Sequence, residues 1–181
     1  MTFAIGPIDK IFMEDRKSDG YWMKLALAEA GKALELGETP VGAVIVKDSR
    51  LIGRGGNRVE TLRDPTAHAE IIAIGAAAEA TGYERLLDST MYLTLEPCPM
   101  CAGAIVLSRI PRLVYGAADP KMGACGSRYD ICRDRTLNHV VEVSAGIMEE
   151  ECSGILREFF RNLRNARRGA RAVEWGGLEN R

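Results

Sequence analysis

Short β-branched runs alternate with helical stretches after an opening hairpin, and this order restricts the fold of the chain more than any other feature. Met23, Leu27 and Ala30 form one apolar face, which predicts a helix from Ser18 or Asp19 to about Leu36. Strands follow at 41–47 and 51–55, joined by a turn at 48–49. Elements then alternate: a helix over 64–80, a strand at 90–95, a loop entering a helix over 97–109, strands at 112–117 and 139–143, and a helix over 149–168. This order predicts a layered α/β domain with a mixed sheet.

Basic residues are concentrated near the end of the chain, although the overall charge is nearly balanced. Lys and Arg number 24 against 25 Asp and Glu, for a formal net charge of −1. Residues 156–172 hold six arginines and a single acid, Glu158, which leaves the remainder distinctly acidic. The global charge does not argue for nucleic-acid binding, but this asymmetry suggests a basic arm for an anionic partner. A solvated helix face would give the same pattern.

The five cysteines form no pattern typical of secreted proteins. They are Cys98, Cys101, Cys125, Cys132 and Cys152. Their odd number indicates free or metal-bound thiols in a reducing compartment. Since no window approaches the roughly 20 apolar residues of a membrane span, and the first 20 residues lack a signal-peptide pattern, we expect a cytoplasmic protein with no membrane partner.

Two short segments bring together the residue types of a zinc site. Residues 66–70 supply His68 and Glu70, and residues 96–101 supply Cys98 and Cys101. Zinc prefers nitrogen and sulfur ligands in a tetrahedron, and a C-x-x-C pair at a helix start places both sulfurs on one face. His68 would be the third ligand. Three protein ligands leave one position for water, which is the arrangement of a catalytic zinc.

Glu70 is the candidate general base of this site. Two thiolates neutralise the formal charge of Zn²⁺, so such a zinc should acidify water less than an all-imidazole site does. A nearby carboxylate is then needed to take the proton and deliver it to the substrate. Residues two apart do not share a helix face, so His68 and Glu70 must approach the metal from the first turn of their helix. The start signals at 64–66 place them there.

The combination H-x-E followed by P-C-x-x-C is the signature of zinc nucleobase deaminases. Several further stretches narrow the resemblance: 38–43, 64–70, 95–104, 123–127, 137–139 and 159–161. From about Tyr21 to Arg164 the chain resembles the tRNA-specific adenosine deaminases, within the cytidine-deaminase-like superfamily. Residues 1–18 would be a poorly ordered extension, 19–168 the deaminase domain and 169–181 a C-terminal tail.

The resemblance implies a three-layer α/β/α domain with a five-stranded sheet, acting as a homodimer on a tRNA anticodon stem-loop. It implies one zinc per subunit on His68, Cys98 and Cys101, with Glu70 as proton shuttle. By the same resemblance Asn57 and the backbone around Ala67 would hold the purine, and Asp119 would lie near a flanking nucleotide. Phe159, Phe160 and Arg161 would contact the anticodon loop. The helical periodicity instead places Phe159 and Phe160 in the core, so the two lines of argument leave their roles open.

Two other functions fit parts of this sequence. A guanine or free-nucleoside deaminase of the same superfamily would use the same zinc chemistry, but would leave the arginine-rich helix without a task. A non-catalytic zinc module that binds RNA would leave Glu70 and the open ligand position unexplained.

Overall fold

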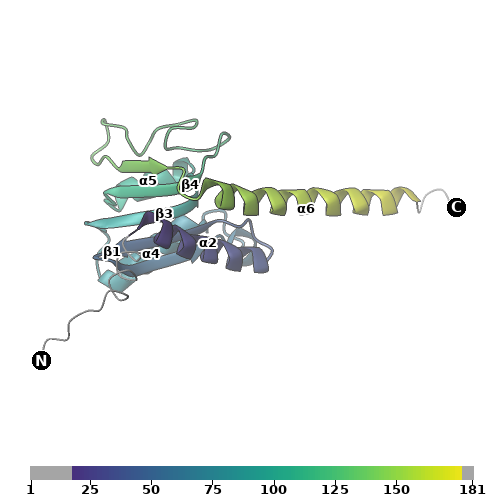
Figure 1. Cartoon of the computed structure of the whole chain (residues 1–181), viewed down its shortest axis with the longest axis horizontal. Helices are drawn as coiled ribbons and strands as arrows, with labels where there is room; N and C mark the ends of the chain where they lie inside the picture. Colours follow the sequence, from purple (N-terminus) through teal and green to yellow (C-terminus); the bar gives the residue numbers. More distant parts are fainter. Residues whose placement is uncertain (1–17, 177–181) are drawn as a thin grey trace, which may run out of the picture.

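A five-stranded sheet in the order β2-β1-β3-β4-β5 forms the middle layer of the protein (Figure 1). The computed structural model describes residues 18–176. Strand β1 pairs antiparallel with β2 and β3, whereas β3, β4 and β5 run parallel. The strands are β1 (Gly42–Lys47), β2 (Arg50–Gly56), β3 (Ser89–Leu95), β4 (Arg112–Ala117) and β5 (Glu142–Ala145). The predicted mixed sheet is confirmed.

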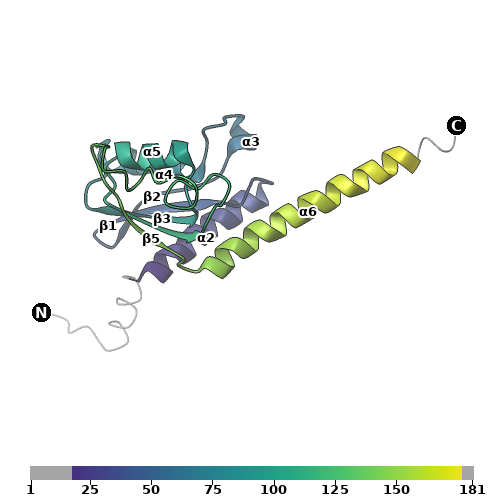
Figure 2. The same ribbon diagram turned by 90° about the horizontal axis from the view of Figure 1, so that it is seen from above.

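Helices cover both faces of this sheet, which completes the expected three layers. Seen from above, α4 and α5 lie over one face and α2 and α6 over the other (Figure 2). The helices are α2 (Asp19–Glu35), α3 (Val59–Leu62), α4 (Ala69–Thr81), α5 (Pro99–Leu107) and α6 (Glu149–Gly176). The short helix α3 was not predicted, because four residues carry no detectable periodicity.

The interior strand β1 is buried on both faces and separates two cores. Ala43 and Ile45 belong to the core beneath α4 and α5. Val44 and Val46 belong to the core beneath α2. Successive side chains of a strand point to opposite faces, so an uninterrupted apolar run is what a strand covered by helices on both sides requires.

Helix α4 packs unusually close to the edge strand β2. Ala69, Ala73 and Ala77 are fully buried on the inner face of the helix. A Cβ atom at Gly53 would collide with the backbone of Ala73 and with Ala77. The small residues on both elements therefore set the distance between helix and strand, and with it the position of the helix start that enters the functional site.

Several element boundaries differ from the sequence prediction. Strand β5 begins at Glu142 instead of 139, because the Val141 amide donates to the carbonyl of Cys132 (2.8 Å) and not to the sheet. Helix α4 begins at Ala69 instead of 64, after an ordered turn in which Asp64 accepts from the Thr66 amide (2.8 Å).

Helix α6 extends to Gly176, eight residues past the expected end at 168. Its alanine- and arginine-rich sequence favours helix and contains no proline to stop it. The expected extension over 1–18 lies outside the described residues except for Ser18, and residues 177–181 of the expected tail also lie outside them.

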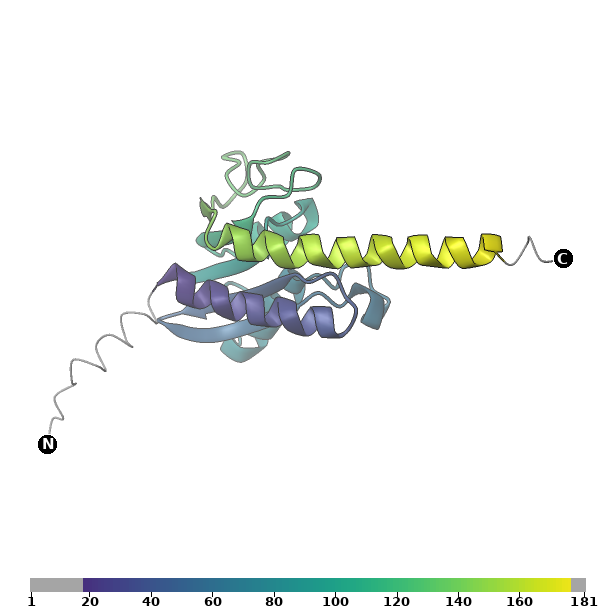
Figure 3. The same ribbon diagram turned by 45° about the vertical axis from the view of Figure 1, so that its right-hand side comes forward.

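The second half of α6 projects beyond the body of the domain (Figures 1 and 3). Leu156 is buried, but Phe160 and Leu163 are 43% and 37% exposed. The core position that helical periodicity gives Phe160 is therefore not observed, and Leu163 is exposed as well, since the helix leaves the sheet before it reaches them. Over residues 18–176, no helix is both long and apolar enough to cross a lipid bilayer.

Candidate metal centre and active site

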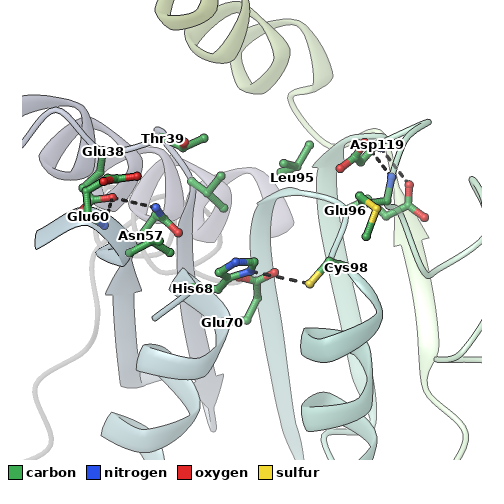
Figure 4. A pocket seen from close by; sticks show the side chains of 13 residues that line it. Glu38, Thr39, Asn57, Glu60, His68, Glu70, Leu95, Glu96, Cys98 and Asp119 are labelled. Atoms are coloured by element: carbon green, nitrogen blue, oxygen red, sulfur yellow. Dashed lines mark hydrogen bonds between the residues drawn. The ribbon is translucent and has the colours of Figure 1, made fainter. Parts of the chain in front are cut away.

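The candidate site lies where the N-termini of α4 and α5 meet the carboxyl ends of the parallel strands. His68 occupies the N-cap position of α4, and Cys98 that of α5. Figure 4 shows the two residues facing each other across the start of the two helices.

His68, Cys98 and Cys101 offer three donor atoms that all lie within 4.8 Å of one another. The Nδ1 atom of His68 is 3.7 Å from the Cys98 sulfur and 3.5 Å from the Cys101 sulfur. Ligands of a tetrahedral zinc, at bond lengths near 2.3 Å for sulfur and 2.0–2.1 Å for nitrogen, stand about 3.6 Å apart. The donor set therefore fits a zinc ion in both chemistry and spacing, as the sequence predicted.

One of these three donors is deprotonated at neutral pH before a metal binds, and the other two hold their protons more tightly than usual. The hydrogen bond from Cys101 lowers the pKa of Cys98 to about 4, so that this sulfur is a thiolate at neutral pH. The same hydrogen bond, together with burial, raises the pKa of Cys101. The hydrogen bond with Cys98 raises the pKa of His68. Metal ligands must be deprotonated, so metal binding at this cluster is expected to release protons and to weaken at low pH.

Glu70 is the second residue of α4 and lies beside the donor cluster, 4% exposed. Burial raises the pKa of its carboxyl group above the ordinary value of 4.5. A carboxylate whose pKa is raised toward the operating pH is a better proton carrier than an ordinary glutamate. The sequence required His68 and Glu70 to approach the metal from the start of one helix, and Glu70 in the first turn of α4 meets this requirement.

A cavity of about 430 Å³ opens in front of these groups. His68, Glu70 and Cys98 line one side, and Asn57 and Asp119 line others (Figure 4). Ala67 is buried next to His68 but is not among the lining residues. Its amide donates to the carbonyl of Asp64 (3.1 Å), and its carbonyl accepts from Arg58 (2.9 Å). Five of the expected site residues thus surround one cavity, and Ala67 supports it from behind.

Two buried glutamates in the cavity wall escaped the sequence analysis. Glu38 and Glu96 are 0% and 2% exposed, and both line the cavity. Glu96 accepts hydrogen bonds from the amides of Asp119 (3.0 Å), Cys125 (2.9 Å) and Ser127 (3.1 Å), and from the Ser127 hydroxyl. Burial alone would raise the pKa of Glu96, but these donors hold it below 4.5. The sequence signal for these two residues was their position. Glu96 directly follows the apolar strand β3, and Glu38 directly follows the glycine after α2.

The expected RNA-contact residues lie in a neighbouring hollow. Phe160 and Arg161 line a second cavity of about 640 Å³ between α6 and the sheet, which shares Leu95 with the first. Lys121, Arg157 and Arg164 also line it, and no acidic residue does. Phe159 is half-buried and its ring contacts that of Phe160, with 5.2 Å between the centroids. Exposure thus separates the pair: Phe160 lies at the surface and lines the hollow, whereas Phe159 is half-buried and does not line it.

The fold and the site together define a metal-dependent nucleobase deaminase. A His-Cys-Cys donor set, a buried glutamate beside it and a cavity in front are the parts that hydrolytic removal of a base amine requires.

Sequence comparison identifies the family. Residues 17–164 match the MafB19-like deaminases. The chain is 48% identical over 153 residues to the tRNA-specific adenosine deaminase of Bacillus subtilis, covering 84% of this chain and 95% of the relative. It is 51% identical over 156 residues to the Haemophilus influenzae enzyme of the same description, covering 86% and 90%. The chain belongs to the MafB19-like deaminase family, within the group that contains these tRNA-specific adenosine deaminases.

Solved structures agree with this assignment. A tRNA:A34 deaminase studied for A-to-I editing at the wobble position superposes with a TM-score of 0.73 at 51% identity, covering 75% of this chain and 99% of that one. A guanine deaminase from Nitrosomonas europaea superposes with a TM-score of 0.66 at 24% identity, covering 87% and 96%. The second likeness shows the shared fold alone.

Proposed function

We propose that the protein is a zinc-dependent deaminase that converts the wobble adenosine of a tRNA anticodon loop to inosine. The observation that carries this proposal is the meeting of His68, Cys98, Cys101 and Glu70 at one cavity, in a chain about half identical to tRNA-specific adenosine deaminases. Five free cysteines and the tRNA substrate favour a reducing cytoplasm as its place of action.

The substrate enters as a single unpaired nucleotide. A cavity of about 430 Å³ is of the size that encloses a small ligand and cannot admit a duplex. An anticodon loop presents bases that can be splayed out of their stack. Asn57 and the backbone behind it at Ala67 would hold the purine, and Asp119 would stand beside the flanking nucleotide.

Glu70 carries the protons of the reaction. When bound, zinc supplies Lewis-acid activation of water at His68, Cys98 and Cys101. The Glu70 carboxylate accepts a proton from the attacking water and delivers it to N1, next to the reacting carbon C6. Hydroxide adds to C6, and Glu70, again a carboxylate, takes the proton of the new C6 hydroxyl. It passes this proton to the amino group as the C6–N6 bond breaks and the C6 carbonyl forms. Adenosine and water give inosine and ammonia, and Glu70 ends in its starting state.

The neighbouring hollow is the proposed docking surface for the rest of the loop. Four basic side chains (Lys121, Arg157, Arg161, Arg164) and the exposed ring of Phe160 line it, and of these Arg161 pairs with Glu158 on the same helix at 3.9 Å. Phosphates bound to such a surface release counterions, so affinity falls steeply with salt. Phe160 could stack on a base, with Phe159 supporting it. We further propose that the enzyme acts as a homodimer, on the strength of the family relationship alone.

The test is inosine formation in three substrates: an anticodon stem-loop with a wobble adenosine, free adenosine and guanine. We expect product in the stem-loop only, and at least a 1,000-fold loss with Glu70→Gln, on the order of the effect of removing an essential proton carrier. If guanine or free adenosine is converted and the stem-loop is not, the proposed substrate is wrong, while the proposed metal centre still stands. Full activity of Glu70→Gln would overturn the mechanism.

A further inference from the structure

Glu38 is a fully buried carboxylate in the cavity wall, on the side away from the metal donors (Figure 4). It directly follows Gly37, which ends α2 with a φ of 76°. None of the ion pairs among residues 18–176 involves Glu38. A buried charge without a cation is costly unless several hydrogen bonds satisfy it. The contacts of Glu38 therefore indicate what the residue is for.

Every hydrogen bond to the Glu38 carboxylate comes from one segment of the cavity wall. The side-chain amide of Asn57 donates to Oε2 at 3.0 Å. The backbone amides of Thr61 and Glu60 donate at 2.7 and 3.3 Å. Burial by itself would raise the pKa of Glu38, but these donors hold it below 4.5. The group is ionised at neutral pH and can only accept hydrogen bonds.

An acceptor-only neighbour fixes the orientation of the Asn57 amide. The group facing Glu38 must be the NH₂, so the amide oxygen points away from Glu38 (Figure 4). The backbone of Asn57 is held as well, because its amide donates to the Val41 carbonyl at 3.0 Å. The side chain is 8% exposed and lines the cavity. Its oxygen and its second N–H are what remain for a ligand.

The same carboxylate caps the short helix α3. Arg58 occupies the N-cap position of α3 and makes no capping hydrogen bond with its side chain. The first amides of a helix need acceptors, and Glu38 supplies them for Glu60 and Thr61. Val59 and Glu60 of this helix line the cavity. One carboxylate thus holds both Asn57 and the adjoining wall.

We propose that Glu38 is a positioning residue for base recognition, acting through Asn57 and through α3. The inference rests on the proposed deaminase function. A fixed amide offers one acceptor and one donor side by side. Since Glu70 acts at N1, the edge of adenine left for this pair is N6/N7, where the exocyclic amine lies beside a ring nitrogen that accepts; the corresponding N7/O6 edge of guanine presents two acceptors. Glu38 therefore contributes to the recognition of this edge of adenine without touching the base.

A double-mutant cycle between Glu38→Gln and Asn57→Ala tests this inference, with kcat, KM for the stem-loop and bound zinc measured for each variant. A glutamine at this position can accept or donate, so it no longer fixes the amide. We expect Glu38→Gln to raise KM about tenfold, the effect of losing one hydrogen bond to a charged group, with zinc content unchanged. In the Asn57→Ala background the same substitution should change KM less than about threefold.

Glu29→Gln is the matched control. Glu29 is another buried glutamate, 9% exposed, on α2 and outside the catalytic cavity, and it pairs with Lys32 at 2.7 Å. We expect Glu29→Gln to leave KM unchanged in both backgrounds, at the wild-type value when it stands alone and at the Asn57→Ala value when the two are combined. If the fold-increase in KM of the double variant equals the product of the fold-increases of Glu38→Gln and Asn57→Ala, the two residues act independently and the inference is overturned. A fall in zinc content or kcat with KM unchanged would also overturn it, because the role would then be only structural.

A swapped pair covers the case in which Glu38→Gln does not fold. The double variant Glu38→Gln/Asn57→Asp keeps one amide and one carboxylate across the same contact. We expect it to fold and bind zinc but to keep a raised KM, because a carboxylate has no N–H to offer the base. A wild-type KM in the folded swap would overturn the inference. If wild-type protein converts guanine or free adenosine and not the stem-loop, the proposed function fails, and the same cycle on that substrate still tests Glu38.

Discussion

Replacing Glu96 by glutamine should destabilise the folded protein, because the carboxylate holds a whole loop. Its two oxygens accept hydrogen bonds from three backbone amides and one hydroxyl, all from residues 119–127. The loop passes so close that a Cβ atom at Gly123 would collide with the Glu96 carboxylate. The same loop carries Asp119 and Met122 in the cavity wall. Glu96 therefore connects the stability of the loop to the shape of the site.

The magnitude follows from the partners of each oxygen. In the best orientation the glutamine oxygen replaces Oε1 and keeps the Cys125 and Ser127 amides, and its NH₂ meets a hydroxyl that can turn to accept. The Asp119 amide then loses its acceptor, which costs about 1–3 kcal/mol. Loss of the charge weakens the two retained bonds by about 1 kcal/mol together. The sum is about 3 kcal/mol, or a fall in melting temperature of about 6–12 °C.

Thermal unfolding of the zinc-loaded protein, with zinc content measured before each scan, checks this prediction. Glu29→Gln serves as the control, because its partners Lys32 and Arg54 are 55% and 61% exposed and such pairs are each worth about 1 kcal/mol or less. A melting temperature within 2 °C of wild type for Glu96→Gln at full zinc occupancy would refute the reasoning. Equal losses for Glu96→Gln and Glu29→Gln would also refute it.

Three further predictions concern the metal, the acid stability and the basic hollow. Cys98→Ala should lose stoichiometric zinc and stability together, because metal binding is coupled to folding; elemental analysis with thermal unfolding checks this. The hydrogen bond from Arg112 lowers the pKa of Asp19 below 3.8. The stabilisation that this pair gives the fold should therefore be present above about pH 5 and be lost as pH falls below 4. In urea unfolding, Asp19→Asn should be less stable than wild type at pH 7, and the difference between the two should shrink in acid. Arg164→Ala should lower stem-loop affinity and reduce the salt dependence by about one phosphate contact, measured as log Kd against log salt.

The catalytic groups were predictable because local sequence fixes their positions. An H-x-E segment at one helix start and a C-x-x-C segment at another carry their own geometry, since the first helical turn dictates where each side chain points. The alternation of strands and helices likewise predicted a layered α/β domain with a mixed sheet, and the family resemblance supplied its three layers, since a sheet with two apolar faces must be covered on both.

Only the tertiary structure showed how Glu38, Glu96 and α3 build the cavity wall. The partners of Glu96 lie 23 to 31 residues further along the chain, and those of Glu38 lie 19 to 23 residues away. Neither periodicity nor a short motif records contacts at such separations. The projection of α6 past the sheet also decided that Phe160 is exposed and not core, since an apolar face is buried only where another element covers it. The sequence thus determined the chemistry of the site, and tertiary packing determined which side chains hold it in place.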